Sequence, residues 1–212
     1  MDKKNTSVFG SRTSMELRGI SCISLEPHQD KRKNCCVSRS FGEKVTKLEY
    51  LNEAITSHCL NAAEKIRLDK QTVKKITVFI RTSPFRTGEN YYANSKDVDL
   101  PIRTNDSIVL VKEALAALKG IYKVGFRYQK TGIIFSGLKD IDIYNKNLFS
   151  TINNEEKRIK LMKAIDHTNA KYGRHALSIA QAGFKKKWNT KKEHSSKIDT
   201  ACFNFLPTVR IV

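Results

Sequence analysis

The stretch KKITVFIRTS, residues 74–83, decides the fold of this chain. Apolar side chains recur at every second position, at Ile76, Val78 and Ile80. Successive side chains of a β-strand point to opposite faces, so this alternation predicts a strand with one buried and one open face. The open face is expected to carry Lys75, Thr77, Phe79 and Arg81.

Two helices, each with one apolar face, lie on either side of this strand in the sequence. Residues 47–67 form the first, which Thr46 can cap and Glu49 completes as a capping box. The second follows Thr104 or Asn105, and both residue types suit an N-cap. The predicted buried stripes are Leu48, Leu51, Ile55, Cys59, Ala62 and Ile66 in the first helix, and Ile108, Val111, Leu115, Leu118 and Tyr122 in the second.

Three more segments have the pattern of strands. They are residues 33–41, SKDVDLP (95–101, ended by Pro101) and YQKTGIIFSG (128–137). The resulting order β-α-β-β-α-β predicts an α+β fold, in which an antiparallel-rich sheet has both helices on one face. Lys130 and Arg39 are expected to join the open face of that sheet.

Charge is the strongest feature of the composition. Lys and Arg exceed Asp and Glu by 39 − 21, a net charge of +18. Residues 157–212 hold 13 of the cations and 3 of the acids, a balance of +10. Such a field attracts polyanions of any base sequence, because neutralising phosphates releases counterions. We therefore favour a nucleic acid as partner over the alternatives, a solvated surface or a Lys-rich composition.

Polar stretches divide the rest of the chain. Residues 1–30 precede the sheet domain of residues 31–138, and residues 139–155 form a polar linker. Residues 156–212 are predicted to be a small basic α/β unit, with a helix ended by Gly173 and a strand-like ALSIA segment. In the following GFKKKW, Trp188 is expected to pack, while Lys185, Lys186 and Lys187 partly face DNA or another acidic partner.

Cysteine usage and hydropathy indicate the compartment. The five cysteines are odd in number and include no C-x-x-C, which argues against a disulfide frame and a zinc ribbon. The chain has no run of about 18 apolar residues and its N-terminus has no apolar signal region. We expect a cytoplasmic protein that does not partner a membrane.

CCVSRSFGEKV, residues 35–45, raises the alternative of RNA recognition. Arg39, Phe41 and Gly42 fit a motif whose aromatic residue stacks bases. Glu43 and Lys44 follow the glycine, however, and the third strand has no aromatic residue. Gly42 is therefore expected to end the first strand, and an RNA-recognition-like binder is the less favoured interpretation.

Several separated segments together resemble one family. They are CVSRSFGEKVTKLEYLNEAITSHCLNAAEKIR (36–67), FIRTSPF (79–85), YYANS (91–95), GFRYQKTGI (125–133) and LMKAIDHTNAKYGRHALSIAQAGFKKKW (161–188). In order and spacing they resemble the C-terminal half of the UmuC family, Y-family translesion DNA polymerases. The resemblance runs from about Arg12 to Arg210, and RTSMELRG (12–19) is similar to the end of the family's thumb.

The resemblance implies a role in DNA repair. Residues 31–138 would be the little-finger domain, which holds template–primer DNA chiefly through the DNA backbone. The family acts in SOS mutagenesis, with a processed UmuD dimer and RecA as partners. The catalytic carboxylates and their magnesium ions would belong to a palm absent from this chain, so we expect no catalytic residue, metal ligand or cofactor here. The residues expected to contact DNA are Arg39, Lys75, Thr77, Arg81, Lys130, Lys185, Lys186 and Lys187.

NKNLF, residues 145–149, occupies the place of the family's sliding-clamp peptide. Leu148 and Phe149 match its apolar anchors, whereas Asn145 replaces a glutamine. The alternative is a linker whose Leu–Phe pair packs on its own domain. The leading interpretation of the whole chain is the DNA-binding part of a UmuC-like polymerase, and the enzymatic alternative is one half of a split polymerase that reassembles with a separate catalytic chain.

Overall fold

The computed structural model describes residues 7–24, 31–85, 90–141, 155–184 and 188–190. The chain forms two compact units, residues 1–31 and residues 32–212. The first unit contains helix α1 (Val8–Glu16), which buries none of its side chains. The second unit contains the sheet and the remaining helices.

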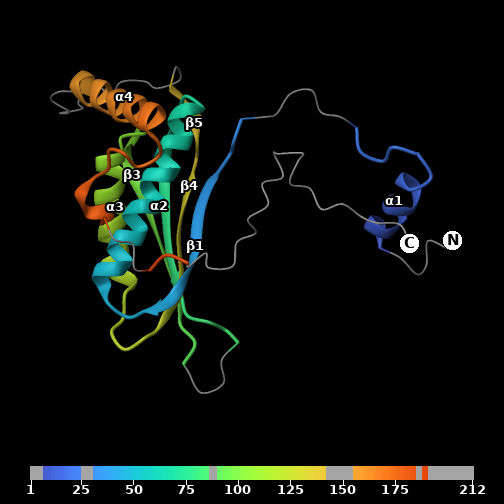
Figure 1. Ribbon diagram of the computed structural model, residues 1–212, viewed down its shortest axis with the longest axis horizontal. Helices are drawn as coiled ribbons and strands as arrows, with labels where there is room; N and C mark the ends of the chain where they lie inside the picture. Colours follow the sequence, from blue (N-terminus) through green and yellow to red (C-terminus); the bar gives the residue numbers. More distant parts are fainter. Residues whose placement is uncertain (1–6, 25–30, 86–89, 142–154, 185–187, 191–212) are drawn as a thin grey trace, which may run out of the picture. The chain divides into compact units, whose positions relative to one another are not determined.

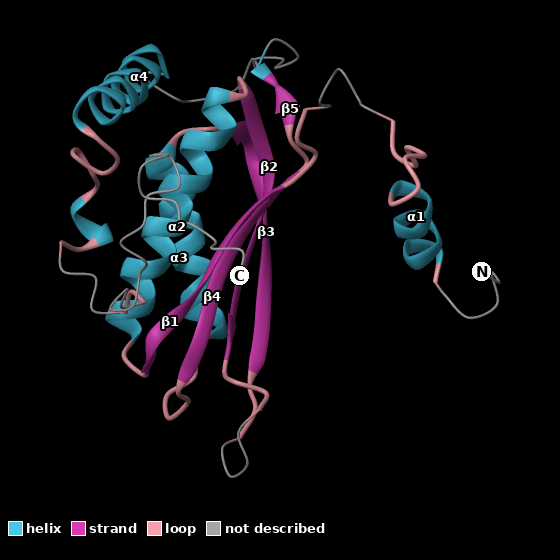
Figure 2. Ribbon diagram, turned by 45° about the vertical axis from the view of Figure 1, so that its right-hand side comes forward, coloured by secondary structure: helices cyan, strands magenta, loops and turns pink. Residues whose placement is uncertain are grey.

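The second unit is a two-layer α+β domain (Figures 1 and 2). Its strands are β1 (Cys35–Val45), β2 (Gln71–Arg81), β3 (Ala93–Thr104) and β4 (Tyr128–Ser136), which lie in the order β1-β4-β2-β3 with antiparallel neighbours. A short β5 (Lys139–Asp140) pairs with the start of β2. Helices α2 (Leu48–Leu68) and α3 (Ser107–Ile121) cover one face, as the sequence predicts.

Two interlocked β-α-β units explain this arrangement. β1 and β2 run parallel with β4 between them, and β3 and β4 run parallel with β2 between them. Crossovers between parallel strands of one sheet are almost always right-handed, which puts both connecting helices on the same side. The predicted alternation in β2 is confirmed, because Ile76, Val78 and Ile80 are at most 1% exposed.

The core lies between this sheet and the two helices. The predicted stripe of α2 is buried except for Leu48, which is partly exposed. In α3, Val111, Leu115 and Leu118 of the predicted stripe are buried and Tyr122 is partly buried, whereas Ile108 is 45% exposed; Leu110 and Ala114 are fully buried in addition. The largest fully buried side chains are Tyr128, Phe135, Leu51, Ile55, Ile66, Ile76, Ile80, Leu100, Leu110, Leu118, Ile133 and His58.

Gly42 does not end the first strand, contrary to the prediction, because β1 continues to Val45. The amide N–H of Gly42 donates a hydrogen bond to the carbonyl oxygen of Trp188 at 3.2 Å. A Cβ at this position would lie 2.7 Å from the carbonyl oxygen of Asn189. Glycine is needed here because a distant segment of the backbone approaches the strand closely.

Pro101 does not end the third strand either. It lies inside β3, which is an edge strand where a missing N–H costs no ladder hydrogen bond on the outer side. The β2 register shifts opposite this point, between Val73 and Lys75. Lys74, at the shift, donates from Nζ to the carbonyl oxygens of Leu100 (2.5 Å) and Pro101 (3.1 Å), which satisfies these acceptors.

The helix caps also differ from the prediction. Helix α2 begins after Lys47 without a side-chain cap, so Thr46 and Glu49 form no capping box. Asp106 caps α3, because its Oδ1 accepts hydrogen bonds from the N–H groups of Ile108 and Val109. A carboxylate is favourable at this end of a helix, where the N–H dipoles point outward.

Residues 155–184 and 188–190 pack on the same unit. Helix α4 (Glu155–Tyr172) is followed by Gly173 with φ +101°, as predicted for a C′ glycine. The ALSIA segment is not a strand; it leads instead into a short 3₁₀ helix, η2 (Ala180–Ala182). Trp188 packs as predicted, but against the sheet unit, with its ring centroid 6.1 Å from that of Phe41 and 5.8 Å from that of His58.

None of the helices in the described ranges combines the length and the apolar character that crossing a membrane requires.

Candidate nucleic-acid interface

The sheet face opposite α2 and α3, called the open face here, is built by alternate residues of four strands. Arg81 and Phe79 of β2 lie beside Lys130 and Gly132 of β4, which confirms the placement of Lys130. Lys75 and Thr77 continue the row along β2, and the register adds residues from the two edge strands. The described open face comprises Cys36, Ser38 and Ser40; Lys130, Gly132, Ile134 and Ser136; Lys75, Thr77, Phe79 and Arg81; and Ala93, Ser95, Asp97 and Asp99.

Arg39 does not belong to the open face, contrary to the prediction. It pairs in register with Thr131, whose side chain is fully buried on the helix side of the sheet. A one-residue step along a strand reverses the face, so Ser40 takes the expected position beside Lys130. Arg39 is nevertheless exposed on the helix side, in the edge strand β1.

An aromatic ring crosses the middle of the open face. Gly132 has no side chain, and a Cβ there would lie 2.5 Å from Cζ of Phe79 and 2.5 Å from Cβ of Ser38. The ring of Phe79 therefore extends from β2 over the glycine of β4 towards β1. It fills the gap that a glycine leaves on a sheet surface, so the face is closely packed at its centre.

The open face has two ends of different charge. At one end, Lys75 Nζ lies 2.8 Å from Asp97 Oδ2, and Asp99 is its cross-strand neighbour. The hydrogen bond from Lys75, with another from Thr77, lowers the pKa of Asp97, and the same bond raises the pKa of Lys75. At the other end, Arg81 and Lys130 are neighbours in register and have no acidic partner among the described residues.

The remaining predicted contacts lie outside the described residues. Lys185, Lys186 and Lys187 of the basic cluster are among them, as are Leu148 and Phe149 of the clamp-binding candidate. Their roles stay predictions. Within the described ranges, no three His, Cys, Asp or Glu side chains come together as a metal site requires.

Two arginine–aspartate pairs hold α4 against the unit. Arg67, near the end of α2, forms a bidentate pair with Asp166, with Nε–Oδ2 at 2.6 Å and Nη2–Oδ1 at 2.7 Å. Arg158 of α4 donates from Nε to Oδ2 of Asp106, the residue that caps α3, at 2.6 Å. Arg67 also donates to the hydroxyl of Ser107 at 2.8 Å, so one guanidinium joins α2, α3 and α4.

A cleft of about 260 Å³ remains beside these pairs, between α2, α4 and residues 175–179. Its wall includes Arg67, Asp166, Leu60, Leu161 and Ile165. Apolar packing under α4 is therefore incomplete, although Met162 is 3% exposed. The ion pairs have a correspondingly large share in docking the helix.

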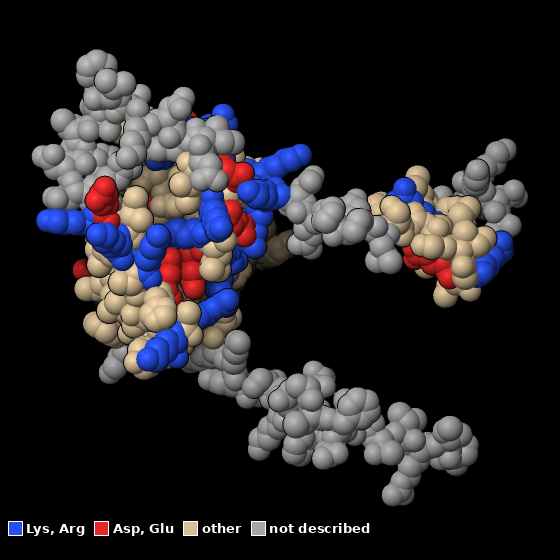
Figure 3. All heavy atoms as spheres, turned by 90° about the horizontal axis from the view of Figure 1, so that it is seen from above, with Lys and Arg blue, Asp and Glu red and all other residues tan. Residues whose placement is uncertain are grey.

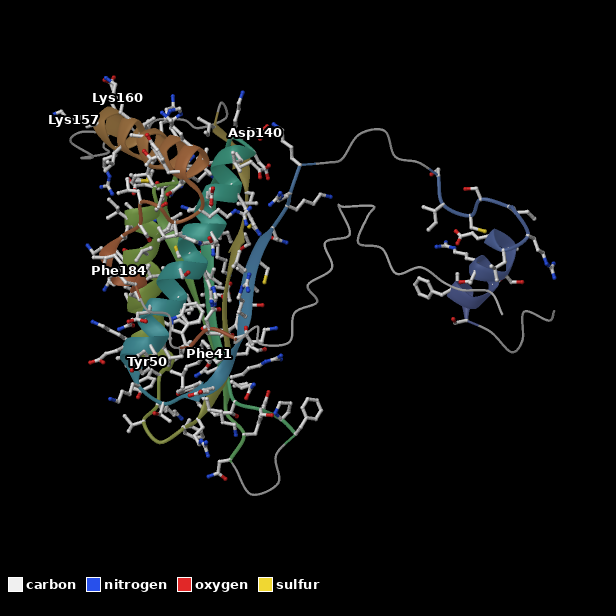
Figure 4. All side chains as sticks on the ribbon, in the orientation of Figure 1. Phe41, Tyr50, Asp140, Lys157, Lys160 and Phe184 are labelled. Atoms are coloured by element: carbon white, nitrogen blue, oxygen red, sulfur yellow. The ribbon has the colours of Figure 1, made fainter. Side chains whose placement is uncertain are left out.

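The outer side of α4 is basic. Lys157, Lys160, Lys163 and Lys171 are exposed, and Figure 4 shows Lys157 and Lys160 pointing away from the unit. Figure 3, which views the molecule from above, shows more Lys and Arg than Asp and Glu among the described residues of the face that it presents. The sequence pattern predicted basic residues in this region, yet it did not indicate Arg67, Arg158 and Asp166 and did not separate the two sides of the helix.

The comparisons identify the class first. A family model described as the impB/mucB/samB family C-terminal domain matches residues 32–148, the part of the chain that forms the sheet, α2 and α3. The chain therefore belongs to this family. A second model, a domain of unknown function, matches residues 159–209 and so includes most of α4.

Individual relatives agree with this assignment. Protein UmuC of Salmonella typhimurium strain LT2 is 36% identical over 208 residues, which cover 98% of this chain and 49% of that protein. Protein ImpB of Salmonella typhimurium is 34% identical and Protein MucB of Escherichia coli 32% identical, each over 99% of this chain. The chain spans about half the length of these relatives. The resemblance to the C-terminal half of UmuC is confirmed.

Proposed function

We propose that the chain is the DNA-binding part of a UmuC-type error-prone translesion polymerase that acts in SOS mutagenesis. The observation that carries the proposal is the similarity to UmuC, which extends over 98% of the chain. The open face supports it, because adjacent cations and small hydroxyl side chains on a sheet surface can contact the phosphates of a duplex. Contacts to phosphates do not distinguish one base sequence from another. The proposed DNA is the template–primer duplex.

The contact is proposed for one end of the open face. Arg81 and Lys130 lie side by side there, with Ser40 next in register, and neither has an ion-pair partner among the described residues. At the other end Asp97 and Asp99 would repel phosphates, and Lys75 is already paired. Of the predicted contacts on the sheet, Arg81 and Lys130 are therefore the main ones.

A salt titration tests this function. The chain should bind duplexes of unrelated sequence with similar affinity, and log K should fall linearly with log salt concentration. Arg81→Gln with Lys130→Gln should reduce the salt slope by about 1.8, which is roughly 0.9 for each lost phosphate contact. Affinity for duplex DNA that is absent, or indifferent to salt, would refute the proposal.

The partners and the missing chemistry are part of the same proposal. We propose that the chain alone incorporates no nucleotide, binds no catalytic magnesium and cooperates with a processed UmuD dimer, RecA and, through Leu148 and Phe149, the sliding clamp. Family membership supports these assignments. Primer extension with magnesium by the pure chain would contradict them.

One observation favours the split-polymerase alternative. Val8, Phe9 and Leu17, in and next to α1, are 67%, 77% and 85% exposed, and α1 buries no residue. Apolar side chains of this kind are stabilised when a partner covers them. If that partner is a separate catalytic chain, mixing the two should restore primer extension, and Phe9→Ser should weaken the reassembly.

A further inference from the structure

The outer side of α4 has a one-sided charge distribution. An α-helix has 3.6 residues per turn, so Lys157, Lys160 and Lys171 lie within about 60° of one another, with Lys163 on the flank. All four side chains are exposed. Among the described residues, no ion-pair partner contacts Lys157, Lys160 or Lys163. Together, Lys157, Lys160, Lys163 and Lys171 are called the α4 ridge.

Of the two acids that the structure describes on α4, Asp166 is turned inward and Glu156 is exposed. Between residues 156 and 172 the acidic side chains are Glu156 and Asp166, and Asp166 is held by Arg67 under the helix. Met162 is buried on that inner side. The two ion pairs and the buried methionine therefore fix which side of α4 faces solvent, so the ridge is a preorganised row of cations.

The other helices show what an ordinary solvated helix looks like in this chain. On α2, Glu49 and Glu64 alternate with Lys65 on exposed or half-exposed positions. On α3, Glu113 lies next to Lys112. Mixed signs of this kind keep the local potential low, whereas on the outer side of α4 four lysines outnumber one described acid, Glu156.

We propose that the α4 ridge is a second contact for the phosphate backbone of duplex DNA. The inference deepens the proposed function and rests on it. The ridge extends 14 residues from Lys157 to Lys171, roughly 21 Å at 1.5 Å per residue. A duplex of that length carries about 12 phosphates, so several come within reach of the four ammonium groups.

The ridge holds a different stretch of backbone from the one on the open face. α4 is fixed to Arg67 at the end of α2 and to Asp106 at the start of α3, on the helix side of the sheet. Arg81 lies at the far end of β2 from Gln71, a separation of roughly 33 Å at about 3.3 Å per residue, and on the opposite face. The DNA path thus meets the unit at two separate places.

A pair of double variants with equal charge change tests the ridge. Lys157→Gln with Lys160→Gln removes two cations from the ridge, and Lys112→Gln with Lys119→Gln removes two exposed cations from α3. Each is titrated against a duplex of about 30 base pairs, roughly 100 Å long, over a range of salt concentrations. Thermal unfolding followed by circular dichroism checks that both variants keep the fold.

The ridge variant should reduce the salt slope of log K by about 1.8 relative to wild type. Its loss of affinity between about 50 and about 200 mM salt should then be roughly tenfold smaller than that of wild type. The α3 variant should stay near wild type, and Lys157→Arg with Lys160→Arg should bind as wild type does.

The outcomes separate the ridge from the proposed function. If wild type binds duplex with a steep salt slope but the ridge and α3 variants behave alike, the ridge inference is overturned and the open face remains. The ridge inference is also overturned if the ridge variant loses only the binding of an acidic protein. If wild type itself binds no duplex, the proposed function fails and the ridge inference fails with it.

Discussion

The open face of the sheet and the α4 ridge carry the same kinds of side chain in different settings. On the open face, Lys75 is paired with Asp97 and lies opposite Asp99, which leaves Arg81 and Lys130 as the cations without a described partner. On α4, Asp166 is turned inward and the lysines face solvent. The comparison teaches that the placement of the acids, more than the total charge of +18, decides which cations remain without an acidic partner.

The largest expected effect destroys both surfaces together. Val78→Ala should lower the free energy of unfolding by roughly 2–3 kcal/mol, because it removes two buried methyl groups and leaves a cavity beneath the sheet. The open face and the docking site of α4 depend on the same core. Urea unfolding measures the change, and Val124→Ala, at an 83% exposed residue, is the matched control. Equal stability of the two variants would contradict this account of the core.

The next effect separates the two surfaces. Asp166→Ala leaves the guanidinium of Arg67 without its carboxylate partner and should cost about 1–3 kcal/mol. Hydrogen exchange should show faster opening of α4, while the amides of β2 keep their protection. Glu156→Ala, at an exposed acid on the same helix, is the control and should change stability by about 0.5 kcal/mol or less. Unchanged protection in α4 would show that apolar packing alone docks the helix.

A thiol probe compares the two surfaces directly. Cys36 is exposed on the open face, and Ala164 is exposed on the outer side of α4. Burial raises the thiol pKa of Cys35 and of Cys59, which keeps both in the unreactive neutral form. With Cys22 and Cys202 replaced by Ser, duplex DNA should slow maleimide labelling of Cys36 severalfold.

The companion variant carries Ala164→Cys with Cys36→Ser in the same background. DNA should slow its labelling as well if the α4 ridge binds phosphates. Protection at Cys36 alone would restrict the interface to the open face. Protection at neither position would place the DNA on another surface.

The smallest effect concerns the paired end of the open face. The hydrogen bond from Lys75 lowers the pKa of Asp97 below its ordinary value of 3.8. Because the folded-state pKa is the lower one, the pair stabilises the fold above that value and loses its contribution as the pH falls through the folded pKa. In Lys75→Met the carboxyl pKa should rise back towards 3.8, with Asp166, which Arg67 holds on the helix side of the sheet, as the control resonance in an NMR titration. An unchanged titration of Asp97 would show that the pair does not persist in solution.

The element order was predictable because it rests on local periodicity. The alternation of Ile76, Val78 and Ile80 and the helical spacing of Leu51, Ile55 and Cys59 are visible within short windows, and burial follows them. The strand ends were not predictable. Glycine is needed at position 42 because the backbone next to Trp188, far away in the sequence, lies close to it. Pro101 is tolerated because β3 is an edge strand.

The candidate site was predictable only in part, for a similar reason. Lys75, Thr77, Arg81 and Lys130 share a face because strand periodicity is strict, but Arg39 is one residue out of step. The ion pair between Arg67 and Asp166 joins residues 99 positions apart, so no local sequence pattern could predict it. The spacing of Lys157, Lys160 and Lys171 could have indicated a basic helical side, yet the direction that side faces follows from the two ion pairs and the buried Met162.

Trp188 joins the C-terminal segment to the core of the sheet domain, which limits how the two regions can vary independently. Its ring lies between Phe41 of β1 and His58 of α2, and its carbonyl oxygen accepts the N–H of Gly42. The segment matched as a domain of unknown function thus closes the core of the domain that precedes it. Exchanging one of the two regions between relatives would remove the contacts of Trp188 with Phe41, His58 and Gly42. We therefore expect related sequences to have both glycine at position 42 and tryptophan at position 188, or neither.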